Sequence, residues 1–343
     1  MKKFMERFSL PRSKPGAALP ATLCALAAVA AVAMRPRISR VQTGQVAVIT
    51  GGSRGFGLAL ARQFGRAGLK LVLAARHADE LAQARRSLLH DGDVQHQDDI
   101  LLVDCDLTDR EQCARLIDAA LRTFGKIDVL VNNAGIIEVG AFEDQPLEAY
   151  DRAMATNFFA ALHTTYAALP SMLERRSGAI VNIASIGGKV AVPHMLPYSA
   201  AKFALVGFSE GLHAETRSKG VRVTTVCPGL MRTGGEVHAQ FVGDVEKEKR
   251  WFGISAKTPG IAVAADDAAR AVFRAVNAGR AEITISPQAW LAARVHGLAP
   301  ETTQFAASLA NRFLLPESLA QAPASAPLPA SHADEPFVDP SPS

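Results

Sequence analysis

The stretch QVAVITGGSRGFGLALARQFGRAG, residues 45–68, joins a run of β-branched residues to a helical pattern through a glycine-rich turn. Gly51, Gly55 and Gly57 stand at that turn. Glycines there let the backbone turn tightly and approach a pyrophosphate, to which the next helix N-terminus offers free N–H groups. The spacing G-x-x-x-G-x-G differs from the usual G-x-G-x-x-G fingerprint. The alternative is a turn that serves helix–strand packing alone, but the strand before and the helix after favour phosphate binding.

Further short apolar runs of this kind alternate with longer helical patterns along the chain. They are KLVLAA (70–75), ILLVDCD (100–106), IDVLVNNAG (127–135), GAIVNIAS (178–185), VRVTTVCPG (221–229) and AEITIS (281–286). Continuous apolar strands separated by helices indicate a parallel sheet that is covered on both faces. The sequence therefore predicts a doubly wound, Rossmann-type α/β sandwich of three layers with a mainly seven-stranded parallel sheet.

The composition divides the chain into five segments. They are a basic N-terminal segment (1–16), a candidate membrane anchor (17–34), the α/β domain with the glycine-rich turn (44–285), a C-terminal helical extension (286–315) and a Pro/Ala-rich tail (316–343). We expect two helices in the extension, broken around Gly297 and Pro300. The tail contains too little apolar surface to form a core and is expected to be disordered.

The charge of the chain is mild, at +4, and comes largely from the first forty residues, where eight basic residues face one acid. The remainder is close to neutral and carries no electrostatic footprint for nucleic acid. The four cysteines lack both metal-ligand spacing and a disulfide framework, so we expect small buried side chains and no metal site.

Residues 17–34 hold no charge and have basic residues on both sides. As a helix they span about 27 Å, just short of a hydrocarbon core of about 30 Å. Three alternatives compete: a membrane anchor, a signal peptide cleaved after Ala31-Val32-Ala33, and an amphipathic surface helix. The higher basic count before the segment slightly favours export of the rest.

The end of the second strand bears on the choice of cofactor. An acid there would bind the ribose hydroxyls of NAD, but Ala74 and Ala75 are followed by Arg76. Arg54 lies within the glycine loop. Two guanidinium groups that converge on a 2′-phosphate favour NADP(H), and the alternative is that either arginine points to solvent.

Tyr198 and Lys202 lie four residues apart in LPYSAAKFALVGFSEGL, residues 196–212, and thus on one face of the expected helix. One explanation is that both side chains extend their polar ends to the surface. The other is that the lysine makes the tyrosine acidic.

Taken together, these motifs resemble the short-chain dehydrogenase/reductase family, in its single-domain branch, over residues 44–285. The motifs are TGGSRGFG (50–57), Asp106-Leu107, NNAG (132–135), Asn157, Ser185, YSAAK (198–202) and PGLMRT (228–233).

The resemblance implies four catalytic roles. Tyr198 is the expected general acid in carbonyl reduction, or the base in alcohol oxidation. Lys202 is expected to lower the tyrosine pKa and to hold the nicotinamide ribose. Ser185 is expected to bind the substrate oxygen, and Asn157 to hold a water linked to the lysine.

The resemblance also implies the cofactor contacts, with Phe56 standing where the family usually has a small aliphatic residue. The expected contacts are Gly51, Ser53, Arg54, Gly55, Phe56, Gly57, Arg76, Asp106, Leu107, Asn133, Ala134, Gly135, Tyr198, Lys202, Pro228, Gly229, Leu230 and Thr233.

The sequence thus predicts an NADP(H)-dependent oxidoreductase that acts on a small to medium, hydrophobic carbonyl or alcohol. The stretch 234–265, with Phe241, Trp251 and Phe252, is the expected lid over the substrate. The alternative is a non-catalytic NADP-binding sensor. We expect no nucleic-acid partner. We expect membrane association through residues 17–34, with the catalytic domain facing the cytosol. A homo-oligomer is also expected, because homo-oligomers are frequent in the family.

Overall fold

The computed structural model describes residues 40–232, 239–257 and 262–319. The predicted segments 1–16 and 17–34, Thr233 and most of the predicted tail lie outside these ranges, so those expectations stay predictions. Among the described residues, no helix combines the length and hydropathy needed to cross a bilayer.

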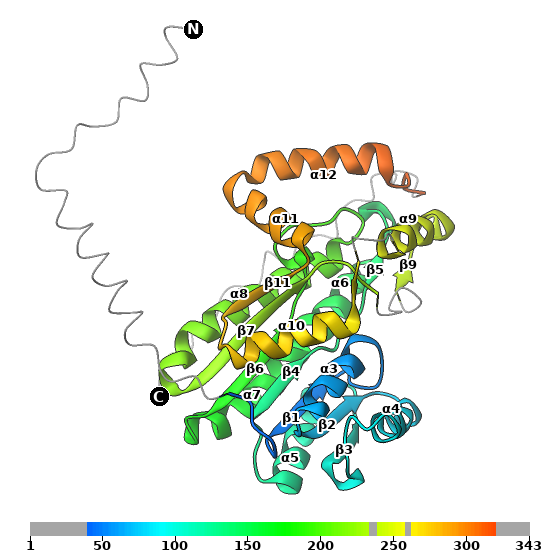
Figure 1. Cartoon of the computed structure of the whole chain (residues 1–343). Coiled ribbons are helices and arrows are strands. Elements are labelled where there is room, and N and C mark those ends of the chain that lie inside the picture. The colour runs from blue at the N-terminus through cyan, green and yellow to red at the C-terminus, as the bar shows by residue number, and fades with distance from the viewer. Residues whose placement is uncertain (1–39, 233–238, 258–261, 320–343) are drawn as a thin grey trace, which may run out of the picture. The chain divides into compact units, whose positions relative to one another are not determined.

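A parallel sheet of seven strands forms the centre of the domain, with the strand order β11-β7-β6-β4-β1-β2-β3 (Figure 1). The strands are β1 (Val46–Thr50), β2 (Lys70–Ala75), β3 (Ile100–Asp104), β4 (Val129–Asn132), β6 (Gly178–Ile183), β7 (Val221–Pro228) and β11 (Glu282–Ile285). Each lies within one of the seven apolar runs in the sequence, so the predicted doubly wound fold is confirmed. The order reverses direction between β1 and β4, which is where such folds bind ligands.

Helices cover both faces of the sheet. Helices α3 (Gly55–Arg66), α4 (Ala78–His90) and α10 (Ala265–Asn277) pack on one face, and α5 (Arg110–Phe124) and α7 (Ala160–Glu174) on the other. Helix α8 (Leu196–Thr216) packs beside α7. The sheet is therefore buried on both sides, which explains why its strands read as continuous apolar runs.

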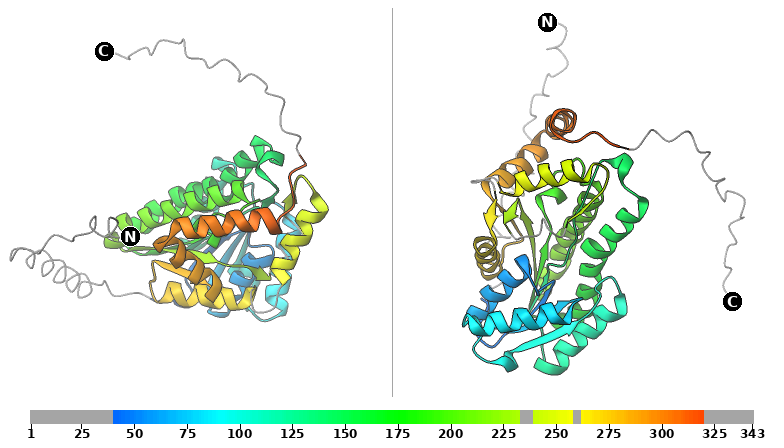
Figure 2. Two further views of the ribbon diagram at one scale, coloured as in Figure 1. Left: turned by 90° about the horizontal axis from the view of Figure 1, so that it is seen from above. Right: turned by 90° about the vertical axis from the view of Figure 1, so that its right-hand side faces the viewer.

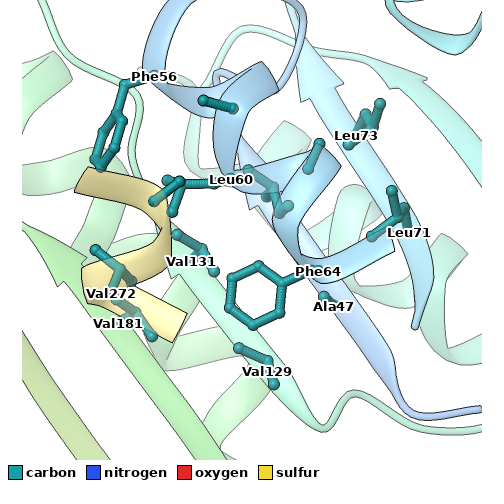
Figure 3. Close-up of a cluster of buried hydrophobic side chains, with 14 of the residues drawn as sticks. Ala47, Phe56, Leu60, Phe64, Leu71, Leu73, Val129, Val131, Val181 and Val272 are labelled. Carbon is teal, nitrogen blue, oxygen red and sulfur yellow. The ribbon is translucent and has the colours of Figure 1, made fainter. Parts of the chain in front are cut away.

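The alternation of side chains along β1 connects the two cores. Ala47 and Ile49 point into the cluster around α3, and Val46 and Val48 into the cluster around α5. Figure 3 shows Phe64 of α3 among these strand side chains, and its ring meets that of Phe273 edge to face at 5.4 Å. This packing fixes α3 against the face of the sheet.

Two short parallel pairs attach the lid to the body of the domain. Strand β5 (Glu138–Val139) pairs with β9 (Gln240–Phe241), and β8 (Met231–Arg232) pairs with β10 (Val263–Ala264). Between β9 and β10 lies the lid helix α9 (Val245–Lys257).

The C-terminal extension forms the two expected helices, α11 (Pro287–Leu298) and α12 (Pro300–Leu314). Proline begins each of them, where its missing N–H costs no intrahelical bond. Figure 1 shows both helices at the same end of the domain as α9.

Candidate active site

The glycine loop opens into a cleft of about 390 Å³ at the carboxyl ends of β1, β2 and β3. Gly51 and Gly55 have φ of +64° and +54°, which favour glycine. A Cβ at Gly57 would lie 1.9 Å from the Gly51 carbonyl oxygen, so this glycine is needed for close packing. Gly51 and Gly55 thus serve the tight turn expected of a phosphate-binding loop, whereas Gly57 serves close packing.

The loop has the properties that a dinucleotide phosphate needs. Within the described chain, no side chain caps the N-terminus of α3 and no acid lies in its first turn. Its first N–H groups are therefore available to an anion, and the helix dipole favours one there. Asn133 holds the loop from the neighbouring strand, since its Nδ2 donates to the Thr50 carbonyl at 3.0 Å.

Most predicted cofactor residues line this one cleft. They are Gly51, Ser53, Arg54, Gly55, Phe56, Gly57, Arg76, Asp106, Leu107, Asn133, Ala134 and Gly135. Pro228, Gly229 and Leu230 lie in the adjoining cleft with Tyr198 and Lys202. These residues come together because the strands of a parallel sheet all end at the same edge.

An acid that the sequence analysis missed lies beside Arg54. Glu80, in the first turn of α4, lines the same cleft as Arg54 and the exposed Arg76. Its Oε2 lies 3.6 Å from Arg54 Nε and accepts a hydrogen bond from Ser53 Oγ at 3.0 Å. Glu80 follows Arg76 by only four residues, at the start of the next helix, so the sequence offered a signal for an acid close to this arginine. The cleft thus pairs a carboxylate with one of the two guanidinium groups expected to bind a 2′-phosphate.

The adjoining cleft, of about 440 Å³, is lined mainly by apolar side chains. It joins the first cleft through Phe56, Asn133, Gly135, Ile136 and Ile137, which line both. Its outer wall includes Trp251 and Phe252 of the lid helix. The aromatic side chains expected in the lid thus face the same space as the catalytic candidates, except Phe241, which packs edge to face on Phe252.

Ser185 and Tyr198 meet across Gly187. A Cβ at Gly187 would lie 3.3 Å from Tyr198 Cε1 and 3.4 Å from Ser185 Oγ, so the glycine lets the two side chains approach. Ser185 Oγ also accepts a hydrogen bond from the Gly187 N–H at 3.0 Å. Burial raises the pKa of Tyr198, and a hydrogen bond with Ser185 opposes that rise.

Lys202 is only 3% exposed, and its Nζ donates to the Ile183 carbonyl at 2.8 Å. Burial lowers the pKa of this ammonium to about 8. Its Nζ lies 5.7 Å from the centre of the Tyr198 ring, as expected for residues four apart on α8. The pKa values of both residues are thus governed by burial, whereas the sequence suggested that the lysine charge would dominate.

Asn157 lies in a single π-helical turn, Ala155–Phe159, that leads into α7. Its Oδ1 accepts from the Ile136 N–H at 3.2 Å, and its Nδ2 donates to the Ile136 carbonyl at 3.1 Å. A Cβ at Gly135 would lie 2.6 Å from Asn157 Oδ1 and 3.5 Å from Lys202 Nζ. The asparagine therefore fixes the backbone beside the lysine, and π-turns of this kind are frequent at functional sites.

A buried hydrogen-bonded pair, His194 and Glu248, that the sequence analysis did not identify holds the lid helix. His194 Nδ1 lies 2.6 Å from Glu248 Oε1, and both side chains are buried. The other carboxylate oxygen, Oε2, accepts a hydrogen bond from Trp251 Nε1. Since Met195 follows His194 and lines the apolar cleft together with Trp251, the pair connects two segments that form the same wall of that cleft.

Comparison with known proteins assigns the chain to a family. Residues 45–240 match the family model described as short chain dehydrogenase. The chain is 38% identical over 203 residues to a dehydrogenase/reductase SDR family protein 7-like from Anopheles gambiae, a match that covers 59% of this chain and 64% of that relative. The matched region thus spans less than two thirds of the relative.

Solved structures agree. A short-chain dehydrogenase/reductase from Burkholderia phymatum in complex with NAD has a TM-score of 0.69 and 29% identity, covering 76% of this chain and 95% of that one. A variant actinorhodin polyketide ketoreductase with NADPH has a TM-score of 0.63 and 31% identity, covering 72% and 98%. The chain therefore belongs to the short-chain dehydrogenase/reductase family of oxidoreductases, which bind a nicotinamide cofactor.

Proposed function

We propose that the protein is an NADP(H)-dependent oxidoreductase that transfers a hydride between the nicotinamide and a hydrophobic carbonyl or alcohol. The observation that carries the proposal is the meeting of Ser185, Tyr198 and Lys202 in a cleft that joins the glycine-loop cleft. The bound cofactor supplies or accepts the hydride, and the residues of the chain bind the substrate oxygen and move its proton.

Tyr198 is the proposed proton donor in reduction and acceptor in oxidation. Ser185 Oγ, which lies next to Tyr198 across Gly187, is proposed to bind the same substrate oxygen and to stabilise its developing charge. An unperturbed phenol, with a pKa near 10, is already protonated at neutral pH, and burial raises the Tyr198 pKa further, so Tyr198 holds the proton that a general acid must give. A positive charge in the cleft favours the phenolate, so oxidation requires both Lys202 and a cationic nicotinamide.

Lys202 and Asn157 are proposed to support this proton transfer. Lys202 Nζ lies beside Gly135, which lines both clefts, and is proposed to bind the nicotinamide ribose. Asn157 holds Ile136 in place, and its proposed task of holding a water linked to Lys202 follows from the family motif.

The preference for NADP(H) rests on Arg54 and Arg76, both of which line the cleft. Guanidinium groups match phosphate geometry. Glu80 works against a 2′-phosphate, so we propose that Arg54 exchanges its contact with Glu80 for the phosphate when the cofactor binds.

The preference for a hydrophobic substrate rests on the lining of the second cleft. Val192, Met195, Trp251 and Phe252 form one wall, and Ile136, Ile137, Ile186, Leu230 and Met231 complete the apolar lining. Because NADPH is kept in the cytosol, we propose that the catalytic domain faces that compartment. A homo-oligomer and membrane association through residues 17–34 stay part of the proposal.

The test is the Tyr198→Phe substitution. An enzyme loses turnover by on the order of 100-fold or more while its NADPH affinity is unchanged, because general acid–base catalysis contributes about 10²–10⁴-fold. The readouts are NADPH oxidation with a panel of apolar ketones and aldehydes, and NADPH binding by fluorescence. The matched control is Tyr166→Phe, at an exposed position on α7. Binding of NADPH without turnover by the native chain would instead support the non-catalytic sensor.

A further inference from the structure

Helix α12 turns its polar side toward the domain and its apolar side outward. The residues of α12 that line the cleft between this helix and the core are Thr303, Gln304, Ala307, Ser308, Asn311 and Arg312. On the opposite side, Phe305, Leu309 and Phe313 are spaced four apart and exposed, with 65% of Phe305 and 70% of Phe313 accessible. A helix on the surface of a protein in water has the reverse arrangement, so an apolar medium is expected outside α12.

Helix α11 has a similar exposed stripe. Trp290, Leu291 and Leu298 fall within one face of the helix, and all three are exposed. We call these three residues, together with Phe305, Leu309 and Phe313, the outer face of the hairpin. His296 Nδ1 lies 2.6 Å from Thr303 Oγ1, which joins the two helices on their inner sides.

Arginines accompany the aromatic residues of this outer face. The Arg294 guanidinium lies 3.9 Å from the centre of the Trp290 ring. Arg312 stands at the border between the cleft side of α12 and the outer face, and its guanidinium lies 5.3 Å from the centre of the Phe313 ring. Aromatic rings with cationic side chains beside them are typical of the boundary between lipid headgroups and acyl chains.

The charges decide between a bilayer and a second copy of the chain. Residues 287–314 contain two arginines and one glutamate. A two-fold contact brings the same face of both copies together, so the arginines beside Trp290 and Phe313 would face those of the other copy. Anionic lipid headgroups would instead neutralise these arginines.

We propose that the outer face of the hairpin binds the surface of an anionic lipid bilayer, with its apolar side chains at the headgroup–acyl boundary. Stable binding of this kind usually takes two signals. The first forty residues, with eight basic residues and one acid, provide a second signal of matching charge.

The experiment uses the full chain with one tryptophan at a time. The chain has two, Trp251 and Trp290. Trp251→Phe leaves Trp290 as the reporter on the outer face. Adding Trp290→Phe and Phe305→Trp moves the reporter to α12, and Leu147→Trp in the same background moves it to α6 (Leu147–Met154), where Leu147 is 80% exposed. Each chain is mixed with vesicles of phosphatidylcholine and phosphatidylserine whose acyl chains carry bromine, a short-range quencher.

The tryptophans at 290 and 305 are expected to lose about half of their emission, since side chains at this boundary lie about 5–10 Å deep, and the one at 147 to lose almost none. When Phe305→Ser and Phe313→Ser are combined, half-maximal quenching of Trp290 should require on the order of tenfold more lipid. When Leu147→Ser and Tyr166→Ser are combined, the lipid requirement should stay unchanged. Unquenched reporters at 290 and 305 would overturn the proposal, whether the vesicles bind the chain elsewhere or not at all. A blue-shifted emission at 305 without lipid would also overturn it, because a second copy or another segment would then cover the face.

Discussion

Truncation of the buried carboxylate that holds the lid helix, Glu248→Ala, is expected to lower stability and weaken substrate binding together. The change removes the partner of His194 and of Trp251 Nε1 at once. An unsatisfied buried donor costs about 1–3 kcal/mol, and loss of a hydrogen bond to a charged group about 1.5–3 kcal/mol. The expected decrease in the free energy of unfolding is therefore about 2.5–6 kcal/mol.

The same substitution should act on one cleft only. Trp251 loses the bond that orients it in the apolar wall, so the KM for an apolar substrate should rise on the order of tenfold. The glycine-loop cleft has no contact with Glu248, so NADPH affinity should stay unchanged. Glu248→Gln keeps the shape and one acceptor oxygen but replaces the other oxygen with a donating amide, and it should show a smaller effect, about 1–2 kcal/mol.

Urea unfolding followed by circular dichroism measures the first effect, and initial rates measure the second. The control is Glu246→Ala on the same helix, where the side chain is exposed and the expected change is within about 0.5 kcal/mol. A Glu248→Ala protein with native stability and native KM would refute the reasoning, because the pair would then hold nothing in place.

Three further substitutions test the rest of the site. Gly57→Ala should weaken NADPH binding on the order of 100-fold, measured by fluorescence titration, because its Cβ would lie 1.9 Å from the Gly51 oxygen and displace the loop. Glu80→Gln should strengthen NADPH binding about two- to fivefold and leave NADH unchanged, because one exposed charge beside Arg54 is worth about 0.5–1 kcal/mol; equal gains for both cofactors would remove Glu80 from the discrimination. Lys202→Met should stabilise the fold most below pH 8. The pKa of this lysine falls from 10.5 unfolded to about 8 folded, so the unfolded state binds the proton more tightly, and the native chain gains stability as the pH rises from 8 to 10.5. The advantage of the methionine variant should shrink by about 3 kcal/mol over that interval in urea unfolding, and a constant advantage would contradict the buried ammonium.

The fold and the positions of the catalytic candidates could be predicted from sequence for one physical reason. Parallel strands that are buried on both faces need continuous apolar runs, and all of them end at one edge. Residues that follow different runs, such as Ser185 after β6 and Asp106 after β3, therefore come to the same side of the sheet. Local spacing then places Tyr198 and Lys202 on one helical face.

The features that the sequence did not reveal depend on contacts between distant segments. His194 and Glu248 are 54 residues apart and share no periodic pattern. The direction of the Tyr198 pKa shift follows from how deeply the surrounding elements bury it, and no local motif encodes that depth. Likewise, the four-residue period of Phe305, Leu309 and Phe313 predicts an amphipathic helix but does not say which side faces the domain.

The arrangement of the two clefts has a consequence for protein engineering. The groups proposed to discriminate between cofactors, Arg54, Arg76 and Glu80, all precede β3, whereas the apolar wall with Met195 and Trp251 follows β6. Among the residues that the structure describes, five line both clefts, and none of these groups is one of them. A library that randomises Arg54, Arg76 and Glu80 can therefore be recombined with one that randomises Met195 and Trp251, because neither set lines the other cleft.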